Sequence, residues 1–541
     1  MADIDPDYAA VAEAVRGQNR PLAIQLAARA LKRGNSHPLV LLLAAEGLEE
    51  RGQYLPALDL LRAATRAAPS HRVAWMRLAA LLARQRIFPE AAAAFDQVLA
   101  IDPDSYGALM GAGEMRLLLR DPAAAERHYL RAAEIAPGAA APLAVLAVMA
   151  AQHRKVGAAR ELAGRAAALA PGILGAEMAI ARADLLEGAP TLAEARLTAL
   201  LGRTDIDDEN RAGVFDIRAE AFDALDRTDE AFADYETRNA ILLRINAPSF
   251  GGESAERLPD MARGLAAFVE RTPHDVWRAP GDDGGADRKT ARRHVFLLGF
   301  PRSGTTLLEK VLAGHPDAVT LEEVNYLTAA SQELRGGETG WRRLADLTGP
   351  EAEACRETYW RLVSESLGGD VSGKIVIDKL PLHTLELPVI AKLFPNARIL
   401  FALRDPRDVV LSCYRRRFQV NVAMFEFLTL DGAASFYDAT MSLADAARAR
   451  LRLDIREVRH EAVIADFDQE VGEILGFIGA DWDPAVRNFA ERVGGHMKTP
   501  SYSQLARGLN ADGVGQWRRY ERQMAPILET LAPWVARFGY F

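Results

Sequence analysis

The sequence predicts an all-α helical solenoid in its first half, followed by a three-layer α/β domain built on a parallel sheet. Three observations carry this prediction. Prolines recur every 34 residues, at Pro69, Pro103, Pro137 and Pro171. A glycine-bearing loop at residues 299–306 lies between an apolar run and a helical stretch. From residue 294 on, short runs rich in β-branched and aromatic residues alternate with helical segments, which is typical of parallel sheets. These predicted strands are 295–298, 375–377 and 398–403, with 455–458 as a fourth candidate.

Composition places the chain among ordinary globular proteins. Of its 541 residues, 49% are hydrophobic and 26% are charged, and the formal net charge is −9. This acidic balance disfavours a nucleic-acid-binding protein. The two cysteines, Cys355 and Cys413, are too few for a disulfide framework and show no metal-ligand spacing. We therefore expect a cytoplasmic chain with no metal site and no nucleic-acid partner.

Neither a secretory signal nor a membrane span is expected. Residues 1–6 are acidic and lack an apolar core. Residues 136–153 contain no Asp, Glu, Lys or Arg, but they are mostly alanine and include Pro137, Gly138 and Pro142. A spanning helix needs about 20 strongly apolar residues. The stretch fits the 34-residue register better than it fits a bilayer.

Paired helices are predicted from residues that share the proline period. An alanine stands twelve residues before each of the four prolines, at Ala57, Ala91, Ala125 and Ala159. Small side chains allow two helices to pack closely, and proline marks the point where the second helix has ended. A helix–turn–helix unit with this period resembles the tetratricopeptide repeat.

We expect about seven such repeats and three parts of the chain. These are a repeat array at 1–247, a connecting helix and flexible linker at 248–293, and the α/β domain at 294–541. The linker starts where the stretch from Pro248 to Gly252 interrupts the helical pattern, and a helix is expected at 255–271. Stacked repeats present a concave face that usually binds a protein or peptide. The alternative is that the array only stabilises the chain or forms a homodimer.

The loop at 299–306 predicts an anion site. A predicted strand at 295–298 leads into it, and a predicted helix at 307–312 follows. In this order the loop amides and the helix N-terminus point at a bound phosphate. Arg302 adds a positive charge. Three hydroxyl side chains add hydrogen-bond donors: Ser303, Thr305 and Thr306.

A comparison with the nucleotide triphosphate loop, Gly-x4-Gly-Lys-Ser/Thr, narrows the ligand. Gly299 and Gly304 match its two glycines, but Thr305 stands where the lysine should be. That lysine contacts the β- and γ-phosphates of ATP or GTP. Its absence disfavours a kinase or NTPase and favours a phosphate that belongs to no transferable triphosphate.

The loop carries a resemblance to a known family. Pro301-Arg302-Ser303-Gly304-Thr305-Thr306 resembles the 5′-phosphosulfate loop of sulfotransferases that use 3′-phosphoadenylyl sulfate (PAPS). The arginine form resembles the tyrosylprotein sulfotransferases. The chain as a whole resembles the bacterial tetratricopeptide-repeat sulfotransferases. The resemblance implies a sulfotransferase domain with a P-loop-like phosphate site and PAPS as co-substrate.

The resemblance further implies a 3′-phosphate site made by an Arg and a Ser eight residues apart. Arg404 and Ser412 have this spacing. Arg404 follows a predicted strand at 398–403, and ligands bind at the carboxyl ends of such strands. The alternative is an arginine paired with Asp405 or Asp408. Arg415-Arg416-Arg417 comes next, and we expect a solvated helix face there rather than the rim of an acceptor site.

Two downstream residues are carried over from the family's nucleotide site. His460 stands where many relatives have a tyrosine near adenine, so the adenine contact stays open. Trp517 lies in a segment similar to the loop that closes over the nucleotide, together with Arg507-Gly508.

The catalytic groups are also implied by the resemblance. Glu322 corresponds to the carboxylate base, with Glu323 as the alternative, and an exposed pair at a helix start is the non-catalytic interpretation. Lys379 and Arg302 are expected to stabilise charge on the oxygen between sulfur and phosphorus. A structural or rim role is expected for His383.

The resulting hypothesis is sulfuryl transfer from PAPS to a hydroxyl acceptor. The acceptor is a protein or peptide tyrosine bound with help from the repeats, although a saccharide or small metabolite is also compatible with this layout. The alternative hypothesis is a repeat-based protein-binding scaffold whose nucleotide-binding domain is not catalytic. The full motif set at Arg302, Glu322, Lys379, Arg404 and Ser412 favours the enzyme.

Overall fold

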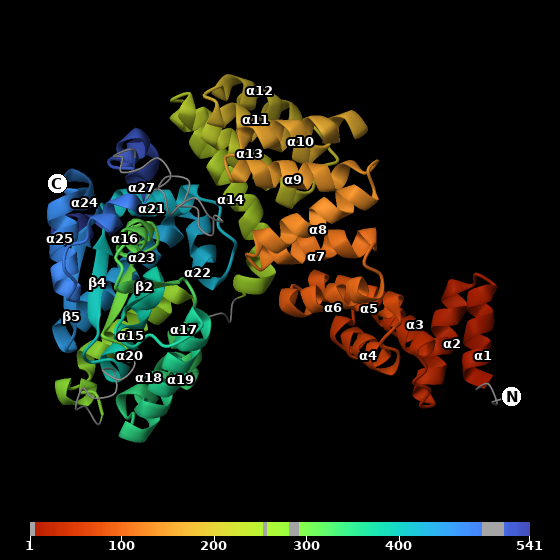
Figure 1. The fold of residues 1–541 in the computed structure, drawn as a ribbon, viewed down its shortest axis with the longest axis horizontal. Coiled ribbons are helices and arrows are strands. Elements are labelled where there is room, and N and C mark those ends of the chain that lie inside the picture. Colours follow the sequence, from red (N-terminus) through yellow and green to blue (C-terminus); the bar gives the residue numbers. More distant parts are fainter. Residues whose placement is uncertain (1–5, 253–256, 281–290, 490–512) are drawn as a thin grey trace. The chain divides into compact units, whose positions relative to one another are not determined.

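A computed structural model describes residues 6–252, 257–280, 291–489 and 513–541, shown as a ribbon in Figure 1. Its internal contacts divide the chain into two compact units, Met1–Ala189 and Pro190–Phe541. The first unit is helical, and the second contains helices together with a parallel sheet. The predicted fold class, a helical solenoid followed by an α/β domain, is confirmed.

The first unit is a run of antiparallel helix pairs. Its helices are α1 (Pro6–Arg16), α2 (Arg20–Lys32), α3 (Pro38–Glu49), α4 (Tyr54–Ala67), α5 (Arg72–Arg84), α6 (Phe88–Ile101), α7 (Tyr106–Leu118), α8 (Pro122–Ile135), α9 (Ala140–Gln152), α10 (Val156–Leu169) and α11 (Leu174–Leu186). The four periodic prolines follow α4, α6, α8 and α10, as predicted. The four periodic alanines are fully buried between helices: Ala57, Ala91, Ala125 and Ala159.

The uncharged stretch at 136–153 forms α9, which packs between α8, α10 and α11. Leu143, Ala147 and Met149 are buried in this packing. In the part of the chain that the structure describes, no helix has the length and apolarity that a bilayer crossing requires. The sequence-based interpretation of this stretch as a repeat helix is confirmed.

The second unit begins with helices that we expected in the repeat array. They are α12 (Pro190–Leu201), α13 (Asp208–Ala224) and α14 (Thr228–Phe250), followed by α15 (Leu258–Arg271) and the short 3-10 helix η1 (His274–Trp277). The expected part limits at 247 and 293 stay predictions. The contacts add that α12–α14 share one compact unit with the sheet.

The helical pattern breaks within the predicted stretch 248–252, at its end rather than at Pro248. Helix α14 continues through Pro248 to Phe250, and the Gly251 amide donates to the carbonyl of Ala247 at 2.8 Å. Proline removes one backbone donor, and a helix loses little when that happens in its last turn. The break therefore comes two residues after the proline.

Five parallel strands form the sheet in the order β2-β3-β1-β4-β5. They are β1 (Arg293–Gly299), β2 (Ala318–Glu322), β3 (Ile375–Lys379), β4 (Arg398–Leu403) and β5 (Asp454–Arg459). The sequence predicted β1, β3, β4 and β5 but missed β2. This edge strand has only five residues, too few to show a clear pattern.

Helices cover both faces of the sheet, which gives the three layers. They are α16 (Thr305–Leu312), α17 (Tyr326–Ala330), α18 (Gly337–Ala345), α19 (Gly349–Leu367), η4 (Pro381–Glu386), α20 (Leu387–Leu393), α21 (Pro406–Arg415), α22 (Val422–Phe425), α23 (Leu430–Arg450), α24 (His460–Ala465), α25 (Phe467–Ile478), η6 (Pro484–Phe489), η8 (Gln516–Tyr520) and α27 (Glu521–Arg537). Alternate residues of β1 enter two separate cores. Phe296 and Leu298 pack on one side, and Val295 and Leu297 pack on the other.

Candidate functional site

The loop after β1 approaches its neighbours so closely that it needs glycine at two positions. A Cβ on Gly299 would lie 2.6 Å from the carbonyl oxygen of Ala402 in β4. A Cβ on Gly304 would lie 2.7 Å from His460 Nδ1, and Gly304 has a φ of 97°. Arg302 also has a positive φ, 73°. A backbone conformation of this kind in a non-glycine residue is typical of functional loops.

Helix α16 starts directly at this loop, with Gly304 as its N-cap. Ser303, Thr305 and Thr306 are buried around the first turn. The first amides of a helix have no intrahelical acceptor and carry a partial positive charge. The predicted strand, loop and helix are therefore present in the order that an anion site requires.

Arg302, Arg404 and Ser412 meet at the carboxyl ends of β1 and β4. Arg302 Nε donates to Ser412 Oγ at 3.0 Å, and Arg404 Nη1 donates to the carbonyl of Arg302 at 3.1 Å. Burial, together with the neighbouring Arg416 and Arg404, lowers the pKa of Arg302 to about 9. The site thus gathers positive charge that an anion would stabilise.

Arg404 does not form an ion pair with Asp405 or Asp408, which was the alternative interpretation of this residue. Its guanidinium donates to the carbonyls of Arg302 and Gly513. Asp405 pairs with Arg407 at 2.7 Å, and Asp408 accepts the amides of Gly515 and Trp517 at 2.6 and 2.8 Å. Within the described residues, the buried Nε of Arg404 has no hydrogen-bond partner.

A cavity of about 390 Å³ opens beside these residues. Its lining is rich in arginine, with acidic and polar side chains interspersed: Glu220, Asp223, Ala224, Tyr235, Arg404, Asp408, Leu411, Ser412, Arg415, Arg416, Gly513, Gln516 and Arg519. Arg404 and Ser412, which were predicted as a pair, both line it. In the described ranges, Arg416 has no ion pair and no side-chain hydrogen bond.

A second polar cluster forms around Lys379 at the end of β3. Lys379 Nζ lies 2.7 Å from Glu323 Oε1 and 2.9 Å from Glu309 Oε2. The side chains of Lys379 and Glu309 are each 1% exposed, whereas that of Glu323 is 29% exposed. Glu309 also pairs with Lys310 at 3.1 Å. Two carboxylates thus fix the buried Lys379 ammonium.

Glu309 was not among the predicted residues. Its signal in the sequence is a charged pair, Glu309-Lys310, inside an otherwise apolar helix at 307–312. A carboxylate on a helix that packs against a sheet must be paired when it is buried.

The Glu322-Glu323 pair ends β2 and faces Lys379 in the sheet register. Glu322 is the register partner of Lys379, and the Glu323 amide donates to the Lys379 carbonyl at 3.2 Å. Glu323 has a φ of 32°, a strained backbone for a non-glycine residue. The Glu322 side chain lies outside what the structure describes, so its assignment as the base stays a prediction. The interpretation of this pair as a helix start is wrong, because it ends a strand.

His383 is buried behind this cluster rather than at its rim. Its Nε2 lies 3.3 Å from Asn325 Oδ1, and its Nδ1 lies 3.6 Å from Asp378 Oδ1. Burial lowers the pKa of His383 to about 3 and raises the pKa of Asp378 to about 7. The Tyr359 hydroxyl donates to Asp378 at 2.8 Å. These contacts support the structural role that was expected for His383.

His460 and Trp517 lie near the anion site with different surroundings. His460 begins α24 beside Gly304, and burial together with Arg404 and Arg302 lowers its pKa to about 3. The Trp517 ring packs against the Arg407 guanidinium, whose Cζ is 4.0 Å from the ring centroid. The neighbouring Gln516, rather than Trp517, lines the cavity. Contacts of either residue with a nucleotide stay predictions, and Arg507-Gly508 lies outside the described residues.

The expected solvated helix face at Arg415-Arg416-Arg417 is wrong. Arg415 forms an ion pair with Asp223, Arg416 lines the cavity, and Arg417 pairs with Glu209 at 2.7 Å. The partners Asp223 and Glu209 both belong to α13, and the sequence around the arginines does not reveal them. Among the described residues, no group of His, Cys, Asp and Glu side chains is arranged to hold a metal ion.

Comparisons with known proteins agree with this geometry. Residues 294–484 match the model of the sulfotransferase family, and residues 42–106 and 81–140 match that of the tetratricopeptide repeat. The chain is 24% identical over 326 residues to an uncharacterized protein of Aquifex aeolicus, covering 58% of this chain and 41% of that protein. It is 23% identical over 278 residues to protein-tyrosine sulfotransferase A of Caenorhabditis elegans, covering 49% and 71%.

Two further similarities are with a vertebrate enzyme and a solved structure. Protein-tyrosine sulfotransferase 1 of Danio rerio is 23% identical over 262 residues, which cover 46% of this chain and 72% of that protein. The sulfotransferase domain of the Synechococcus PCC 7002 olefin synthase matches with 21% identity and a TM-score of 0.32, covering 45% and 90%. The chain is therefore similar to tetratricopeptide-repeat proteins within residues 42–140 and to the sulfotransferase family over residues 294–484.

Proposed function

We propose that this protein is a sulfotransferase that moves a sulfuryl group from PAPS to a hydroxyl acceptor. One observation carries the proposal. The phosphate loop with Arg302, the pair Arg404 and Ser412, and the Lys379–Glu323 pair all follow the carboxyl ends of neighbouring strands of one sheet. Open parallel sheets bind their ligands at this edge.

The residues present fit a nucleotide with two separate phosphate groups. The loop and the N-terminus of α16 would hold the 5′ end, with Arg302, Ser303, Thr305 and Thr306 as donors. Arg404 and Ser412 would hold the 3′-phosphate. Arg404 lines the cavity together with Ser412 and has no carboxylate ion-pair partner among the described residues, which supports this role.

Sulfuryl transfer needs alignment, an activated hydroxyl and a stabilised leaving group. When bound, PAPS supplies the sulfuryl group and adenosine 3′,5′-bisphosphate as the leaving group. Glu322, or Glu323 in its place, would take the proton of the acceptor hydroxyl as the bond between its oxygen and sulfur forms. Lys379 and Arg302 would stabilise negative charge on the bridging oxygen as its bond to sulfur breaks.

Glu323 has a second role in this proposal because it is the more exposed partner of Lys379. Glu309 holds Lys379 from the buried side, so Lys379 keeps one carboxylate when Glu323 changes partner. This arrangement would let the ammonium turn toward a leaving oxygen without losing all its charge compensation.

The proposed acceptor is a tyrosine hydroxyl in a protein or peptide. The relatives named as protein-tyrosine sulfotransferases support this choice, and the repeats support binding of a polypeptide on the array. A saccharide or small-metabolite hydroxyl is the competing acceptor class.

The test is to incubate the full-length chain with radiolabelled PAPS and a lysate, and to identify the labelled product. A labelled polypeptide that yields sulfotyrosine on alkaline hydrolysis would support the proposal. Label in saccharide or low-mass fractions would keep the activity and change the acceptor class. No label in any fraction, with PAPS unchanged, would favour the non-catalytic scaffold.

A further inference from the structure

The end of α13 and the first turns of α14 form one wall of the cavity. Glu220, Asp223 and Ala224 line it from α13, and Tyr235 lines it from α14. Arg404 and Ser412 lie in the same lining. The helices that precede the sheet domain thus contribute directly to the proposed 3′-phosphate pocket.

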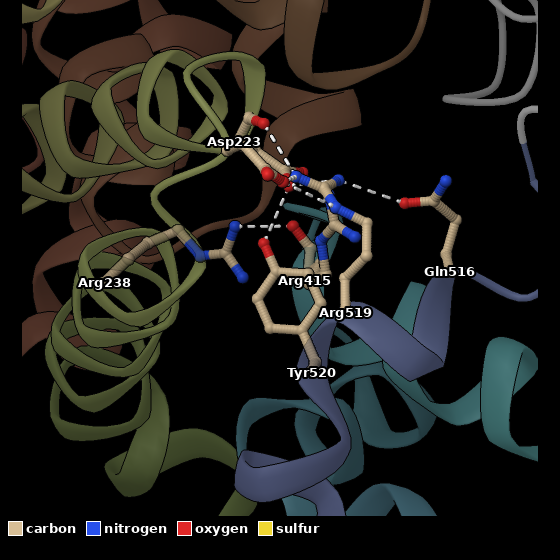
Figure 2. A network of polar contacts seen from close by, with 7 residues as sticks. Asp223, Arg238, Arg415, Gln516, Arg519 and Tyr520 are labelled. Carbon is tan, nitrogen blue, oxygen red and sulfur yellow. Dashed lines mark hydrogen bonds and ion pairs between the residues drawn. The ribbon is translucent and has the colours of Figure 1, made fainter.

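Asp223 connects this wall to two segments of the sheet domain. Its carboxylate forms an ion pair with Arg415, at the end of α21. Its Oδ1 accepts hydrogen bonds from Arg519 Nη1 and from the Tyr520 hydroxyl, each at 2.9 Å, and its carbonyl accepts Arg519 Nη2 at 3.0 Å. Figure 2 shows these side chains converging on Asp223 from α21 and η8. The Asp223 side chain is only 12% exposed.

Side chains of helix α14 bind backbone carbonyls at the same end of α21. Arg238 is fully buried and donates to the carbonyls of Tyr414 and Arg415 at 2.7 and 2.8 Å, and it pairs with Asp216 at 2.6 Å. Asn239 Nδ2 also donates to the Tyr414 carbonyl at 3.1 Å. The last carbonyls of a helix have no intrahelical donor, so these side chains supply what the end of α21 lacks.

The segments held in this way carry the phosphate-site residues. Ser412 lies one turn before Arg415 on α21, and Arg416 follows it directly. Gly513, whose carbonyl accepts from Arg404, lies just before η8. Asp223 bonds to both Arg415 and Arg519, so it joins α21 to η8 in addition to the direct hydrogen bonds of Asp408 with the Gly515 and Trp517 amides.

Charge is divided unequally among the four arginines of the cavity. Asp223 pairs with Arg415 and Arg519. Arg404 and Arg416 have no carboxylate ion-pair partner within the residues that the structure describes. The cations left for an anionic ligand are therefore Arg404 and Arg416, and Asp223 compensates the charge of the other two.

We propose that Asp223 is a positioning residue for the 3′-phosphate of the nucleotide. It acts through Arg415 and Arg519, which hold α21 and η8 so that Arg404, Ser412 and Arg416 converge on one phosphate group. The inference rests on the proposed function, since it takes the cavity as the 3′-phosphate end of the PAPS site. It assigns a part of the donor site to helices outside the segment that matches the sulfotransferase family, 294–484.

The test compares two nucleotides that differ only in the 3′-phosphate. Affinities of the full-length chain for adenosine 3′,5′-bisphosphate and adenosine 5′-phosphate are measured by calorimetry for the wild type and for Asp223→Asn. We expect Asp223→Asn to weaken bisphosphate binding about 10-fold, the lower end of what loss of an outer-shell partner costs at metal sites. The affinity for adenosine 5′-phosphate should change less than about 2-fold, because its phosphate is assigned to the loop at 301–306, and the bonds of Asp223 go to Arg415, Arg519 and Tyr520 instead.

Asp226→Asn is the matched control. Asp226 pairs with the same Arg519 at 2.9 Å, but it is 86% exposed and has no contact with Arg415. It should leave both affinities at the wild-type value. Asp223→Glu should restore part of the lost discrimination, because it keeps the carboxylate.

Three results would overturn the positioning role. In the first, Asp223→Asn leaves both affinities unchanged. In the second, it weakens the binding of both nucleotides equally. In the third, it tightens bisphosphate binding, which would mean that Asp223 only neutralises Arg415 and Arg519. If Asp223→Asn does not fold, Arg519→Gln removes the contact between Asp223 and Arg519 from its more exposed side. The same two affinities are then measured for Arg519→Gln, and the same three results would overturn the proposal. A wild-type protein that does not distinguish the two nucleotides would instead contradict the proposed function.

Discussion

Lys379 and Glu309 form a buried ion pair, with Nζ and Oε2 2.9 Å apart and both side chains 1% exposed. The pair joins the end of β3 to the helix that follows the phosphate loop. It therefore ties the proposed leaving-group cation to the element that would bind the 5′-phosphate.

Replacing Glu309 with Gln should destabilise the fold and disturb catalysis together. The change leaves Lys379 and Lys310 buried with one carboxylate fewer, and breaking a buried pair from one side typically costs about 3 kcal/mol. Urea unfolding measures this loss. Glu338→Gln, which removes an exposed carboxylate paired with Arg342, should leave the unfolding midpoint unchanged. Equal midpoints for wild type and Glu309→Gln would show that the pair contributes nothing to stability.

The base is identified by comparing two neighbouring substitutions. We expect Glu322→Gln to keep nucleotide affinity and to lower turnover about 10²–10⁴-fold, because it removes proton acceptance. Glu323→Gln should affect turnover less, by releasing Lys379 from one of its partners. The reverse order would assign the base to Glu323, and normal turnover in both variants would reject a carboxylate base.

Nucleotide selectivity follows from the two phosphate groups of the proposed site. Adenosine 3′,5′-bisphosphate should raise the melting temperature by binding the folded state, and ATP should raise it much less. Arg404→Ala should remove most of the effect of the bisphosphate, since Arg404 lines the cavity beside Ser412 and has no carboxylate ion-pair partner among the described residues. Equal shifts with ATP and with the bisphosphate would argue against a PAPS site.

Buried histidines make stability depend on pH. Burial lowers the folded-state pKa values of His294 and His383 to about 3, whereas an unfolded histidine titrates near 6.5. Between these values the unfolded chain binds more protons, so the stability present above about pH 6.5 is lost as the pH falls. Urea unfolding at pH 7 and 5.5 should show a smaller decrease for His294→Phe than for the wild type. An equal decrease would show that His294 is not buried in its neutral form.

Truncated chains distinguish the part limit predicted from the sequence, at 247, from the limit between the two compact units, at Ala189. The part limits predicted from the sequence place every predicted phosphate contact after residue 248, so on that division a fragment beginning near Ser249 should bind nucleotide. The structure favours a fragment beginning at Pro190, since Asp223, Arg238 and Asn239 contact α21 or η8. We expect calorimetry to detect bisphosphate binding by the fragment from Pro190 and at least about 10-fold weaker binding by the fragment from Ser249. Equal affinities would show that α13 and α14 do not support the site.

The sequence revealed those parts of the site that are contiguous in the chain. The loop at 301–306 and the Arg404–Ser412 spacing depend on one strand–helix step each, so their local pattern predicts their place. Lys379 was found from the family resemblance of the segment that follows a predicted strand at 375–377, and the structure places it as the last residue of β3.

The contacts that were missed join residues far apart in sequence. Asp223 is 192 residues from Arg415 and 296 from Arg519, and no local pattern links them. The arginine triplet at 415–417 was therefore interpreted as a solvated face. Glu309 was missed because its partner, Lys379, belongs to a strand that comes later in the chain, after helices α17, α18 and α19. Strand β2 was missed because five residues carry too little pattern.

The central claim, enzymatic sulfuryl transfer from PAPS, is tested most directly by product analysis with the purified full-length chain. The chain is incubated with PAPS and a tyrosine-containing peptide mixture, and adenosine 3′,5′-bisphosphate and sulfated peptide are quantified by chromatography and mass spectrometry. We expect the two products in equal amounts, with both lost in the Glu322→Gln, Glu323→Gln double variant. Intact PAPS and unmodified acceptors across peptide, saccharide and small-molecule hydroxyl mixtures, from a folded protein that binds the bisphosphate, would contradict it.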